Sequence, residues 1–355
     1  MLFKQFMHEE GACLSYVIGC TQKSVAAVFE PQLDVASYLQ YLSKNKLKLT
    51  HIFESHSQAD HLSGSKRLAE QTGSPVYFHE SVQANFPVQR LKEGQELMVG
   101  NIKLKVFHTP GHTADSVSLV VTDTTRSIEP WLVLTGDTLF VGDVGRPDLH
   151  GSVEQLYDSI FGKLMTLPDT VEVFPTHYAG SVCGKALSPK PSSTIGFERR
   201  FNMALQYKSK RQFVEFVSSD LPVQPPRFEL VRKFNLGFLA EPPIDKTFDR
   251  SSLEISVEDL KARFDRGEKL FLLDVREPNE YEYANLGGHL IPLRQLPQRI
   301  KELDANAEII VHCHTGSRSA RAVEYLYEKG FKNVKNLEGG IKAWSERIDP
   351  TVPRY

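Results

Sequence analysis

Four apolar segments in the first half of the sequence each lead into a histidine or an aspartate. The four pairs are THIFES before His56, LKVFHTPG before His112, WLVLTG before Asp137 and VEVFPT before His177. Segments of this length and apolarity are typical of strands, and rigid scaffolds often hold ligands in loops at one end of a sheet. Imidazole and carboxylate groups from separate strands suit a first-row transition metal. The sequence therefore predicts a metal site where these strands end.

The spacing around these residues makes the prediction more specific. A single histidine after a strand is most often an ordinary polar loop residue, and the chain has 12 histidines. Here, however, His56 is followed by Asp60 and His61, and the motifs TPGHT, TGD and PTH then come in order. A combination of this kind is hard to reach by chance, so we expect these side chains to form one constellation.

A second set of reactive residues lies around Cys313, where the apolar segment AEIIVHC ends. The residues HTGSR follow and lead into a helical pattern, so Cys313 is expected in a tight loop ahead of a helix. Backbone N–H groups in such a loop point inward, bind anions and lower the pKa of a thiol. Arg318 adds a fixed positive charge. We therefore predict that Cys313 and Arg318 are catalytic; the alternative is that Cys313 is a buried structural cysteine.

The length of this loop indicates which chemistry it serves. Four residues separate Cys313 from Arg318, and they are His314, Thr315, Gly316 and Ser317. Phosphatases of the cysteine type have a longer loop, which forms a wider cradle for phosphate, whereas the shorter loop suits the terminal sulfur of a cysteine persulfide. We expect the four intervening residues to surround that sulfur.

The elements that must position these residues differ between the two parts of the chain. In the first part, strands are predicted at SYVIG, SVAAVFEP, LTHIFE, PVYFHE, IKLKVFHTP, SVSLVVTD, WLVLTGD and VEVFPTH, with helices at VASYLQYLSKN and SGSKRLAEQTG. Helices mixed with antiparallel-looking strands indicate a layered α/β sandwich. From residue 253 onward strands and helices alternate, which predicts a small parallel sheet with helices on both faces.

The sequence of 355 residues has room for two domains with separate cores. A helical, basic stretch over residues 197–219 is followed by LPVQPP, KFNLG and EPPIDKTFDRSSLE. Paired prolines without apolar periodicity are typical of a connecting segment. We place a first domain at residues 1–240, a linker at 241–253 and a second domain at 254–355.

The composition is that of an ordinary globular protein, with 41% hydrophobic and 24% charged residues. A net charge of −2 without a basic tract gives no reason to expect a nucleic-acid partner. The N-terminal segment is acidic where a signal peptide is apolar, and no apolar run reaches the length of a membrane span. The four cysteines indicate reduced thiols. We expect a cytoplasmic protein that binds neither nucleic acid nor membrane. The sequence does not decide whether it forms a homo-oligomer.

Residues 1–240 resemble the metallo-β-lactamase superfamily, whose fold is an αβ/βα sandwich with a metal site at one edge. The first motif of that superfamily is His-x-His-x-Asp-His, but Gln58 replaces its second histidine in HSQADH. In the dizinc hydrolases that histidine completes the first metal site, so this chain keeps His56, His112 and Asp137. Two imidazoles and one carboxylate with open positions suit non-haem iron(II) and oxygen chemistry. Zinc ordinarily prefers a fuller shell.

Within the superfamily the resemblance is to the persulfide dioxygenases. It rests on ESHSQADHLSG, TPGHTADS, LTGDTLFVGDVGRPD and PTHYAGSVCGK, and SSTIGFERRFN is similar to the bacterial forms. The resemblance implies one iron(II) per chain, glutathione persulfide and dioxygen as substrates, and sulfite and glutathione as products. Asp60, His61 and His177 match the superfamily's second metal site. In this branch they are expected mainly as hydrogen-bond partners that orient ligands, with a second metal as the alternative.

Three further residues near these motifs are candidates for contacts with substrate. Arg146 in GDVGRPD could pair with a substrate carboxylate or form a surface salt bridge. Tyr178 directly follows His177 and could bind oxygen or persulfide, or pack in the core. Cys183 is either a bystander or an auxiliary thiol that accepts sulfane sulfur.

Residues 254–350 resemble the rhodanese family through LLDVREPNEYE, CHTGSRS and NLEGGIKAW. The resemblance implies that Cys313 carries sulfane sulfur as a persulfide and moves it among thiosulfate, sulfite and a thiol. Asp274 and Arg276 are expected to hold this domain together by hydrogen bonding. The two domains would then share sulfite and persulfide, in a direction that the sequence leaves open.

Two alternatives compete with this interpretation. The first domain could be a zinc thioester hydrolase of the glyoxalase type, against which Gln58 argues. The second domain could be a binding or sensing module without catalysis, against which the intact Cys313, Gly316 and Arg318 argue.

Overall fold

A computed structural model describes residues 1–8, 10–57, 60–148, 150–181, 183–184, 187–207, 209–219, 228–243 and 253–354. The contacts within the chain divide it into two units, Met1–Pro243 and Ile244–Tyr355. Most of the linker expected at residues 241–253 lies outside the described residues, so its limits stay a prediction. Each unit has its own sheets and cores.

Two six-stranded sheets form the centre of the N-terminal unit. The first has the order β1-β2-β3-β4-β5-β6, with strands β1 (Leu2–His8), β2 (Cys13–Cys20), β3 (Val25–Phe29), β4 (Lys48–Phe53), β5 (Val76–His79) and β6 (Val88–Leu91). The second has the order β12-β11-β10-β9-β8-β7, with strands β7 (Glu96–Val99), β8 (Ile102–His108), β9 (Val117–Asp123), β10 (Leu132–Gly136), β11 (Glu172–Pro175) and β12 (Ser193–Thr194). Both sheets mix parallel and antiparallel pairs.

A core of apolar side chains fills the space between these two sheets. Leu14 and Phe53 of the first sheet belong to the same buried cluster as Leu104, Leu119 and Leu134 of the second. Strands alternate the direction of successive side chains, so each sheet has an inner face toward this core and an outer face that needs another cover.

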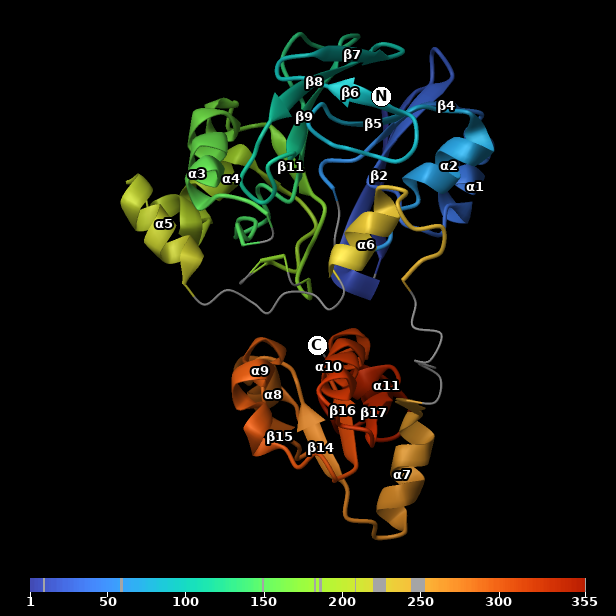
Figure 1. The fold of residues 1–355 in the computed structure, drawn as a ribbon, viewed down its shortest axis with the longest axis vertical. Helices are drawn as coiled ribbons and strands as arrows, with labels where there is room; N and C mark the ends of the chain where they lie inside the picture. The colour runs from blue at the N-terminus through green and yellow to red at the C-terminus, as the bar shows by residue number, and fades with distance from the viewer. Residues whose placement is uncertain are drawn as a thin grey trace. The chain divides into compact units, whose positions relative to one another are not determined.

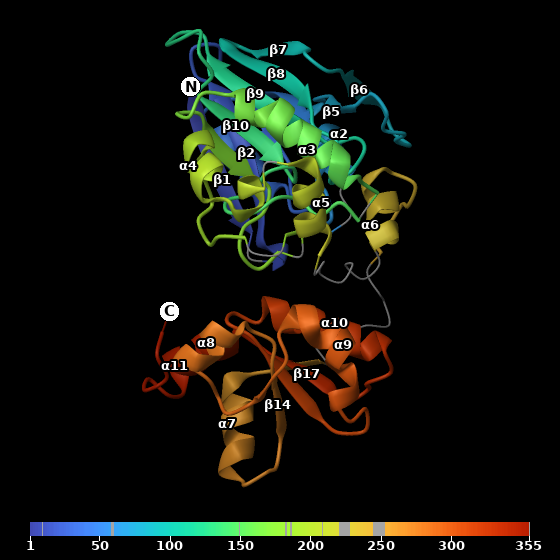
Figure 2. The ribbon, with the colours of Figure 1, turned by 90° about the vertical axis from the view of Figure 1, so that its left-hand side faces the viewer.

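Helices provide that cover on both outer faces. The helices α1 (Ala36–Lys44) and α2 (Ser65–Thr72) pack on the first sheet, and α3 (Val153–Gly162) and α5 (Lys210–Ser218) pack on the second. Figure 1 shows the two pairs on opposite sides of the strands, and Figure 2 shows α3 lying along β9 and β10. The expected αβ/βα sandwich is confirmed. The shorter elements of this unit are η1 (Glu10–Ala12), η2 (Leu164–Thr166), α4 (Ile195–Phe201), η3 (Met203–Gln206) and α6 (Phe228–Asn235).

One helix lies where the sequence predicted a connecting segment. The prolines of LPVQPP led to that prediction, but α6 begins at Phe228, shortly after them, and includes the first residues of KFNLG. Its last residue, Asn235, is buried, and Leu236 joins the apolar cluster between α1, α2 and the first sheet. An apolar stripe this short gives little periodicity to recognise, and contact with the rest of the unit stabilises the helix.

The C-terminal unit contains a five-stranded sheet in the order β13-β17-β16-β14-β15, in which every pair is parallel. Its strands are β13 (Glu254–Ile255), β14 (Phe271–Asp274), β15 (His289–Leu290), β16 (Ile309–His312) and β17 (Val334–Leu337). Its helices are α7 (Val257–Asp265), α8 (Pro278–Tyr283), α9 (Leu296–Arg299), α10 (Ser317–Glu328) and α11 (Gly340–Arg347), with η5 (Leu293–Gln295) and η6 (Ile300–Glu302). Two separate apolar clusters, one with α9 and α10 and one with α7 and α11, cover the two faces. The predicted small parallel α/β domain is confirmed.

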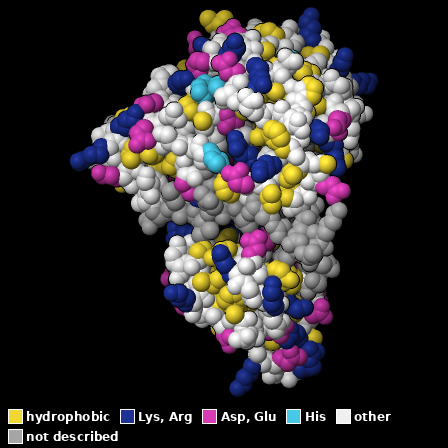
Figure 3. Space-filling view, in the orientation of Figure 1, with side chains coloured by type: hydrophobic (Ala, Val, Ile, Leu, Met, Phe, Trp, Pro, Cys, Tyr) yellow, Lys and Arg dark blue, Asp and Glu magenta, His cyan; other side chains and the backbone are white. Residues whose placement is uncertain are grey.

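Charged side chains are mixed in sign on the surface. On the face in Figure 3, Lys and Arg are interspersed with Asp and Glu over the N-terminal unit. Among the described residues, no helix combines the length and the apolar character that crossing a membrane requires.

Candidate metal centre and sulfur-carrier loop

The candidate metal triad lies where strands of both sheets end. His56 follows β4 of the first sheet, His112 follows β8 of the second, and Asp137 directly follows β10. One ligand atom from each residue lies within 4.8 Å of the other two, and all three residues are buried. The ring centroids of His56 and His112 are 4.9 Å apart, and His112 Nε2 is 3.5 Å from Asp137 Oδ2. The three side chains therefore converge.

Hydrogen bonds at Nδ1 of His56 and His112 orient the two rings in the triad. His112 Nδ1 is 2.8 Å from the carbonyl oxygen of Arg146, which can only accept a hydrogen bond. His112 therefore donates this hydrogen bond from Nδ1, and its Nε2 lies on the side of Asp137. His56 Nδ1 is 2.9 Å from Ser55 Oγ. Burial lowers the pKa of His56 to about 4, so its ring is neutral near pH 7.

Asp137 has one oxygen engaged and one without a partner. Oδ1 accepts hydrogen bonds from Thr176 Oγ1 and from His177 Nδ1, the latter over 2.8 Å. Oδ2 is buried and has no hydrogen-bond partner among the described residues. Burial alone would raise the pKa of Asp137, but the imidazole of His177 and the two triad histidines hold it below its usual range. A buried, ionised carboxylate with an unpaired oxygen is costly unless a cation completes the site, so the triad fits a metal ion.

A glycine permits this approach of the two sheets. Gly136 precedes Asp137 and has a φ of +55°, and a Cβ atom there would lie 2.6 Å from the side chain of Ser55. Only glycine combines this backbone conformation with such a close contact. The glycine of the TGD motif thus lets the end of β10 lie against the loop that carries His56.

A second cluster of ligand-type side chains adjoins the triad through His177. Asp60 Oδ2 lies 2.8 Å from His177 Nε2, and Asp60 Oδ1 lies 3.1 Å from His61 Nδ1. Cys13, which sequence reasoning did not single out, joins them with its Sγ 3.4 Å from His177 Nε2. Burial lowers the pKa of His177, but the carboxylates of Asp137 and Asp60 outweigh it and raise that pKa well above the ordinary value. Gln58, on which the departure from the superfamily motif rests, lies outside the described residues.

Cys183 also lies beside this cluster. Its Sγ donates a hydrogen bond to Asp60 Oδ2 over 3.3 Å, and its ligand atom is close to those of Asp137 and His177. Burial raises the pKa of Cys183 well above the ordinary value, and the charge of Asp60 adds to the effect. The thiol is therefore protonated near pH 7 and interior.

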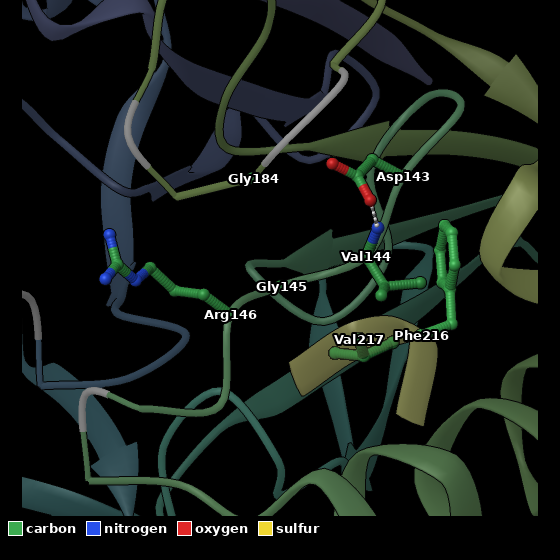
Figure 4. A pocket seen from close by; sticks show the side chains of 7 residues that line it. All are labelled: Asp143, Val144, Gly145, Arg146, Gly184, Phe216 and Val217. Carbon is green, nitrogen blue, oxygen red and sulfur yellow. Dashed lines mark hydrogen bonds between the residues drawn. The ribbon is translucent and has the colours of Figure 1, made fainter. Parts of the chain in front are cut away.

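The other two candidates for substrate contacts are engaged with protein groups. The guanidinium of Arg146 is buried and donates to Asp148 over 2.8 and 2.7 Å. Figure 4 shows the Arg146 side chain extending away from the apolar wall formed by Val144, Phe216 and Val217 in the small pocket beside it. The hydroxyl of Tyr178 donates to the carbonyl oxygen of His8 over 3.3 Å.

Helix α6 supports the loop that carries the first motif. Asn235 accepts a hydrogen bond from Ser63 N and donates one to the carbonyl oxygen of His61, each 2.8 Å long. Arg232 Nε donates to Ser57 Oγ over 3.1 Å. These contacts join positions far apart in the sequence, so no local pattern could have revealed them.

In the C-terminal unit, Cys313 lies between β16 and α10, as expected. It is fully buried, and its Sγ accepts hydrogen bonds from Gly316 N over 3.2 Å and from Ser319 Oγ over 3.4 Å. Gly316 has a φ of +96° and forms the N-cap of α10. The sulfur thus lies in a pocket of donors at a helix N-terminus, an arrangement that favours a negatively charged sulfur.

The NLEGGIKAW segment holds this loop from the other side. Cys313 and His314 accept hydrogen bonds on their carbonyl oxygens from Ile341 N and Lys342 N over 2.9 and 3.0 Å. Gly340 has a φ of +58°, and a Cβ atom there would lie 2.5 Å from both carbonyl oxygens. A cavity of about 70 Å³ adjoins His314.

The charge of Arg318 is shared with a carboxylate that the sequence did not single out. Its two terminal nitrogens donate to the two oxygens of Glu280 over 2.6 and 2.7 Å. Glu280 also accepts a hydrogen bond from Glu277 N at the start of α8. A bidentate pair of this kind fixes the guanidinium plane, so Glu280 orients Arg318 beside the loop.

Asp274 and Arg276 form a fully buried pair. Arg276 Nη2 is 2.6 Å from Asp274 Oδ2, and it also donates to the carbonyl oxygen of Ala284 over 2.6 Å. Arg276 Nη1 donates to the carbonyl oxygen of Glu280 over 3.2 Å. The pair therefore ties β14 to α8, which carries the carboxylate that holds Arg318.

Comparisons with known proteins agree with this division. The family model described as metallo-beta-lactamase superfamily matches residues 9–177, and the one described as rhodanese-like domain matches residues 256–347. The crystal structure of a metallo-beta-lactamase from Staphylococcus aureus subsp. aureus COL is 28% identical, with a TM-score of 0.64, over 95% of this chain and 98% of that chain.

Two further proteins are similar to the N-terminal unit. The crystal structure of ETHE1 from Myxococcus xanthus is 31% identical, with a TM-score of 0.59, over 66% of this chain and 98% of that chain. The hydroxyacylglutathione hydrolase of Idiomarina loihiensis is 34% identical over 157 residues, which are 44% of this chain and 58% of that protein.

Proposed function

This chain belongs to the metallo-β-lactamase superfamily, carries a rhodanese-like domain and is an enzyme of sulfur metabolism with a metal cofactor, and we propose that it is a persulfide dioxygenase–sulfurtransferase. The N-terminal unit would oxidise glutathione persulfide with dioxygen to sulfite and glutathione. The C-terminal unit would move sulfane sulfur among thiosulfate, sulfite and a thiol on Cys313.

The observation that carries the dioxygenase proposal is the donor set of the triad. His56, His112 and Asp137 offer two imidazoles and one carboxylate, without a sulfur ligand. Such a triad leaves coordination positions for both substrates and suits iron(II). Iron(II) held there would supply the electrons that activate dioxygen toward the terminal sulfur. The likeness to ETHE1 supports this branch of the superfamily.

The residues of the chain would position and charge this centre. The carbonyl oxygen of Arg146 keeps the proton of His112 on Nδ1, and His177 and Thr176 keep Asp137 ionised and oriented. Holding persulfide and dioxygen side by side makes their reaction effectively unimolecular. The overall reaction takes one persulfide, one dioxygen and one water to one sulfite, one thiol and two protons.

The second activity follows from the donors around Cys313. Gly316 N and Ser319 Oγ stabilise a thiolate or a persulfide anion on this residue. A thiosulfate sulfur would be transferred to Cys313 with release of sulfite, and a thiol such as glutathione would then take it as a persulfide. The two units share sulfite and persulfide, so either one can feed the other.

A second candidate function for the N-terminal unit has one observation in its favour. The similarity to a hydroxyacylglutathione hydrolase supports thioester hydrolysis with zinc as the alternative. The same triad would then need further ligands, because hydrolytic zinc sites usually bind more nitrogen or sulfur than this triad provides.

One experiment separates the two candidates. Apoprotein is loaded anaerobically with iron(II) or with zinc, and each form is given glutathione persulfide and, separately, S-lactoylglutathione. We expect oxygen uptake only with iron(II) and persulfide. Hydrolysis of the thioester by the zinc form, without oxygen uptake by the iron form, would contradict the proposal.

A further inference from the structure

A small cavity adjoins the Cys313 loop but does not contain the sulfur. Its volume is about 70 Å³, enough for a carboxylate-sized group. The loop contributes His314 to its lining, α11 contributes Lys342 and Glu346, and the segment after α11 contributes Arg354. Among the described residues, neither Cys313 nor a group that donates to its sulfur lines the cavity. The cavity therefore suits a part of a substrate that lies away from the reacting sulfur.

The first turn of α11 fixes the cavity next to the loop. Ile341 N donates to the carbonyl oxygen of Cys313 over 2.9 Å, and the next N–H group of the helix donates to that of His314 over 3.0 Å. These N–H groups are occupied, so the charge in the cavity comes from side chains.

The segment after α11 folds back to form one wall of the cavity. Ser345 Oγ donates to the carbonyl oxygen of Val352 over 2.7 Å, and Val352 N donates to that of Asp349 over 3.1 Å. The side chain of Val352 also packs against the apolar cluster that contains α7 and α11. These contacts hold Arg354 at the cavity, where its Nη2 lies 3.4 Å from the carbonyl oxygen of Ser345.

The lining carries more positive than negative charge. Neither Lys342 nor Arg354 forms an ion pair with a carboxylate among the residues that the structure describes. Arg347 on the same helix differs, because it lies outside the cavity and pairs with Glu258 over 3.3 Å. Glu346 supplies the negative charge of the lining against the two cations. The cavity therefore favours an anionic group.

The position of the cavity distinguishes between the two substrates of sulfur transfer. The oxygens of thiosulfate are bonded to the sulfur next to the one that is transferred, so they stay close to Cys313. The carboxylates of glutathione lie several bonds from its thiol and can reach a neighbouring cavity. We propose that Lys342 and Arg354 bind a carboxylate of the thiol that accepts sulfur from Cys313.

This subsite rests on the proposed sulfurtransferase function and specifies its acceptor. The acceptor thiolate attacks the outer sulfur of the Cys313 persulfide and leaves with it as a new persulfide, while Cys313 is released as a thiolate. A carboxylate bound in the cavity orients the thiol for this attack. An acidic thiol such as glutathione is therefore a better acceptor than an uncharged one.

Steady-state kinetics of the full-length protein test the subsite. Transfer through a Cys313 persulfide is a double displacement, so the donor and the acceptor each have a separate kcat/KM. Thiosulfate is the donor, and glutathione is compared with 2-mercaptoethanol, an uncharged thiol. We expect kcat/KM for glutathione to fall about 3- to 5-fold in Lys342→Met and about 10-fold in the double variant Lys342→Met, Arg354→Met. The values for thiosulfate and 2-mercaptoethanol should stay at the wild-type level.

Two matched variants separate the charge of the cavity from other effects. Arg347→Met removes a cation of the same helix that lies outside the cavity, and it should leave all three constants unchanged. Glu346→Gln removes the negative charge of the lining and should raise kcat/KM for glutathione about 2-fold. Added salt should reduce the difference between the wild type and Lys342→Met, because it screens exposed charges.

The outcomes distinguish this subsite from the function on which it rests. An unchanged kcat/KM for glutathione in the double variant, or an equal fall for 2-mercaptoethanol or thiosulfate, would overturn the subsite and leave sulfur transfer on Cys313 in place. A wild-type protein that takes no sulfur from thiosulfate would overturn the proposed sulfurtransferase function, and the subsite with it.

Discussion

The metal triad and the Cys313 loop reach their chemistry through different parts of the fold. The triad takes His56 from the first sheet of the N-terminal unit and the other two ligands from the second, so its geometry exists only when the sheets pack together. The donors of the Cys313 loop come from one short segment that runs from the end of β16 into the first turn of α10. The first centre therefore depends on long-range packing, and the second is largely local.

The largest expected effect tests whether the two centres are separable. His112→Ala removes a ligand of the triad, and we expect it to abolish oxygen uptake while thiosulfate sulfurtransfer stays at the wild-type level. Cys313→Ser removes the sulfur carrier and should do the opposite. Both activities are measured on each full-length variant. Loss of both in either variant would mean that the centres depend on each other.

Breaking the buried Asp274–Arg276 pair tests whether the Cys313 loop depends on the folding of the C-terminal unit alone. Arg276→Met leaves Asp274 as an unpaired buried charge, and removing one partner of such a pair costs about 3–5 kcal/mol. We expect sulfurtransfer to be lost at a lower denaturant concentration while oxygen uptake keeps its wild-type profile. The double variant Asp274→Leu, Arg276→Met removes both charges and should recover part of the stability.

The buried side chain of His312 should make the stability of the C-terminal unit depend on pH. Burial lowers the pKa of His312 from 6.5 to about 4, and both ring nitrogens are without a hydrogen-bond partner among the described residues. Below pH 6.5 His312 binds a proton in the unfolded chain but stays neutral in the folded chain. The free energy of unfolding therefore falls as the pH drops from about 6.5 to about 4. The expected loss is about 3 kcal/mol.

This loss of stability can be measured by hydrogen exchange of peptides from β14 and β16. The full chain is compared between pH 7 and pH 5, with correction for the intrinsic exchange rates. His312→Gln should flatten the dependence. An unchanged slope in that variant would show that another group carries it.

The smallest expected effect concerns a residue that supports the triad. His177→Gln removes the hydrogen bond to Asp137 Oδ1 while leaving the three ligands in place. Outer hydrogen-bond partners of metal ligands typically change affinity or activity by about 10–100-fold. We expect the affinity for iron(II) and the rate of oxygen uptake to fall within that range, with sulfurtransfer unchanged. A variant as inactive as His112→Ala would place His177 among the ligands themselves.

The difference between the two centres also explains what the sequence could predict. The Cys313 loop could be predicted from the sequence, because its donors are consecutive or nearly so. The strand ends at His56, His112 and Asp137 could be predicted as well, because apolar segments stop there at ligand-type residues. Contacts between distant segments left no such pattern.

Three features illustrate that limit. Cys13 occupies an ordinary position at the start of a strand, and only the bridge to His177 reveals its surroundings. Asn235 lies on a helix too short to show periodicity, and Glu280 orients Arg318 from a separate helix. Each depends on packing that composition and spacing do not encode.

The central claim is that the triad in the N-terminal unit oxidises persulfide sulfur, and the stoichiometry of a single reaction tests it most directly. Full-length protein loaded with iron(II) is given a limiting amount of glutathione persulfide in an oxygen electrode, and sulfite is measured when uptake stops, using Cys313→Ser to prevent conversion of sulfite into thiosulfate. We predict equal amounts of oxygen consumed and sulfite formed. Persulfide loss without oxygen uptake, or oxygen uptake without sulfite, would contradict the account.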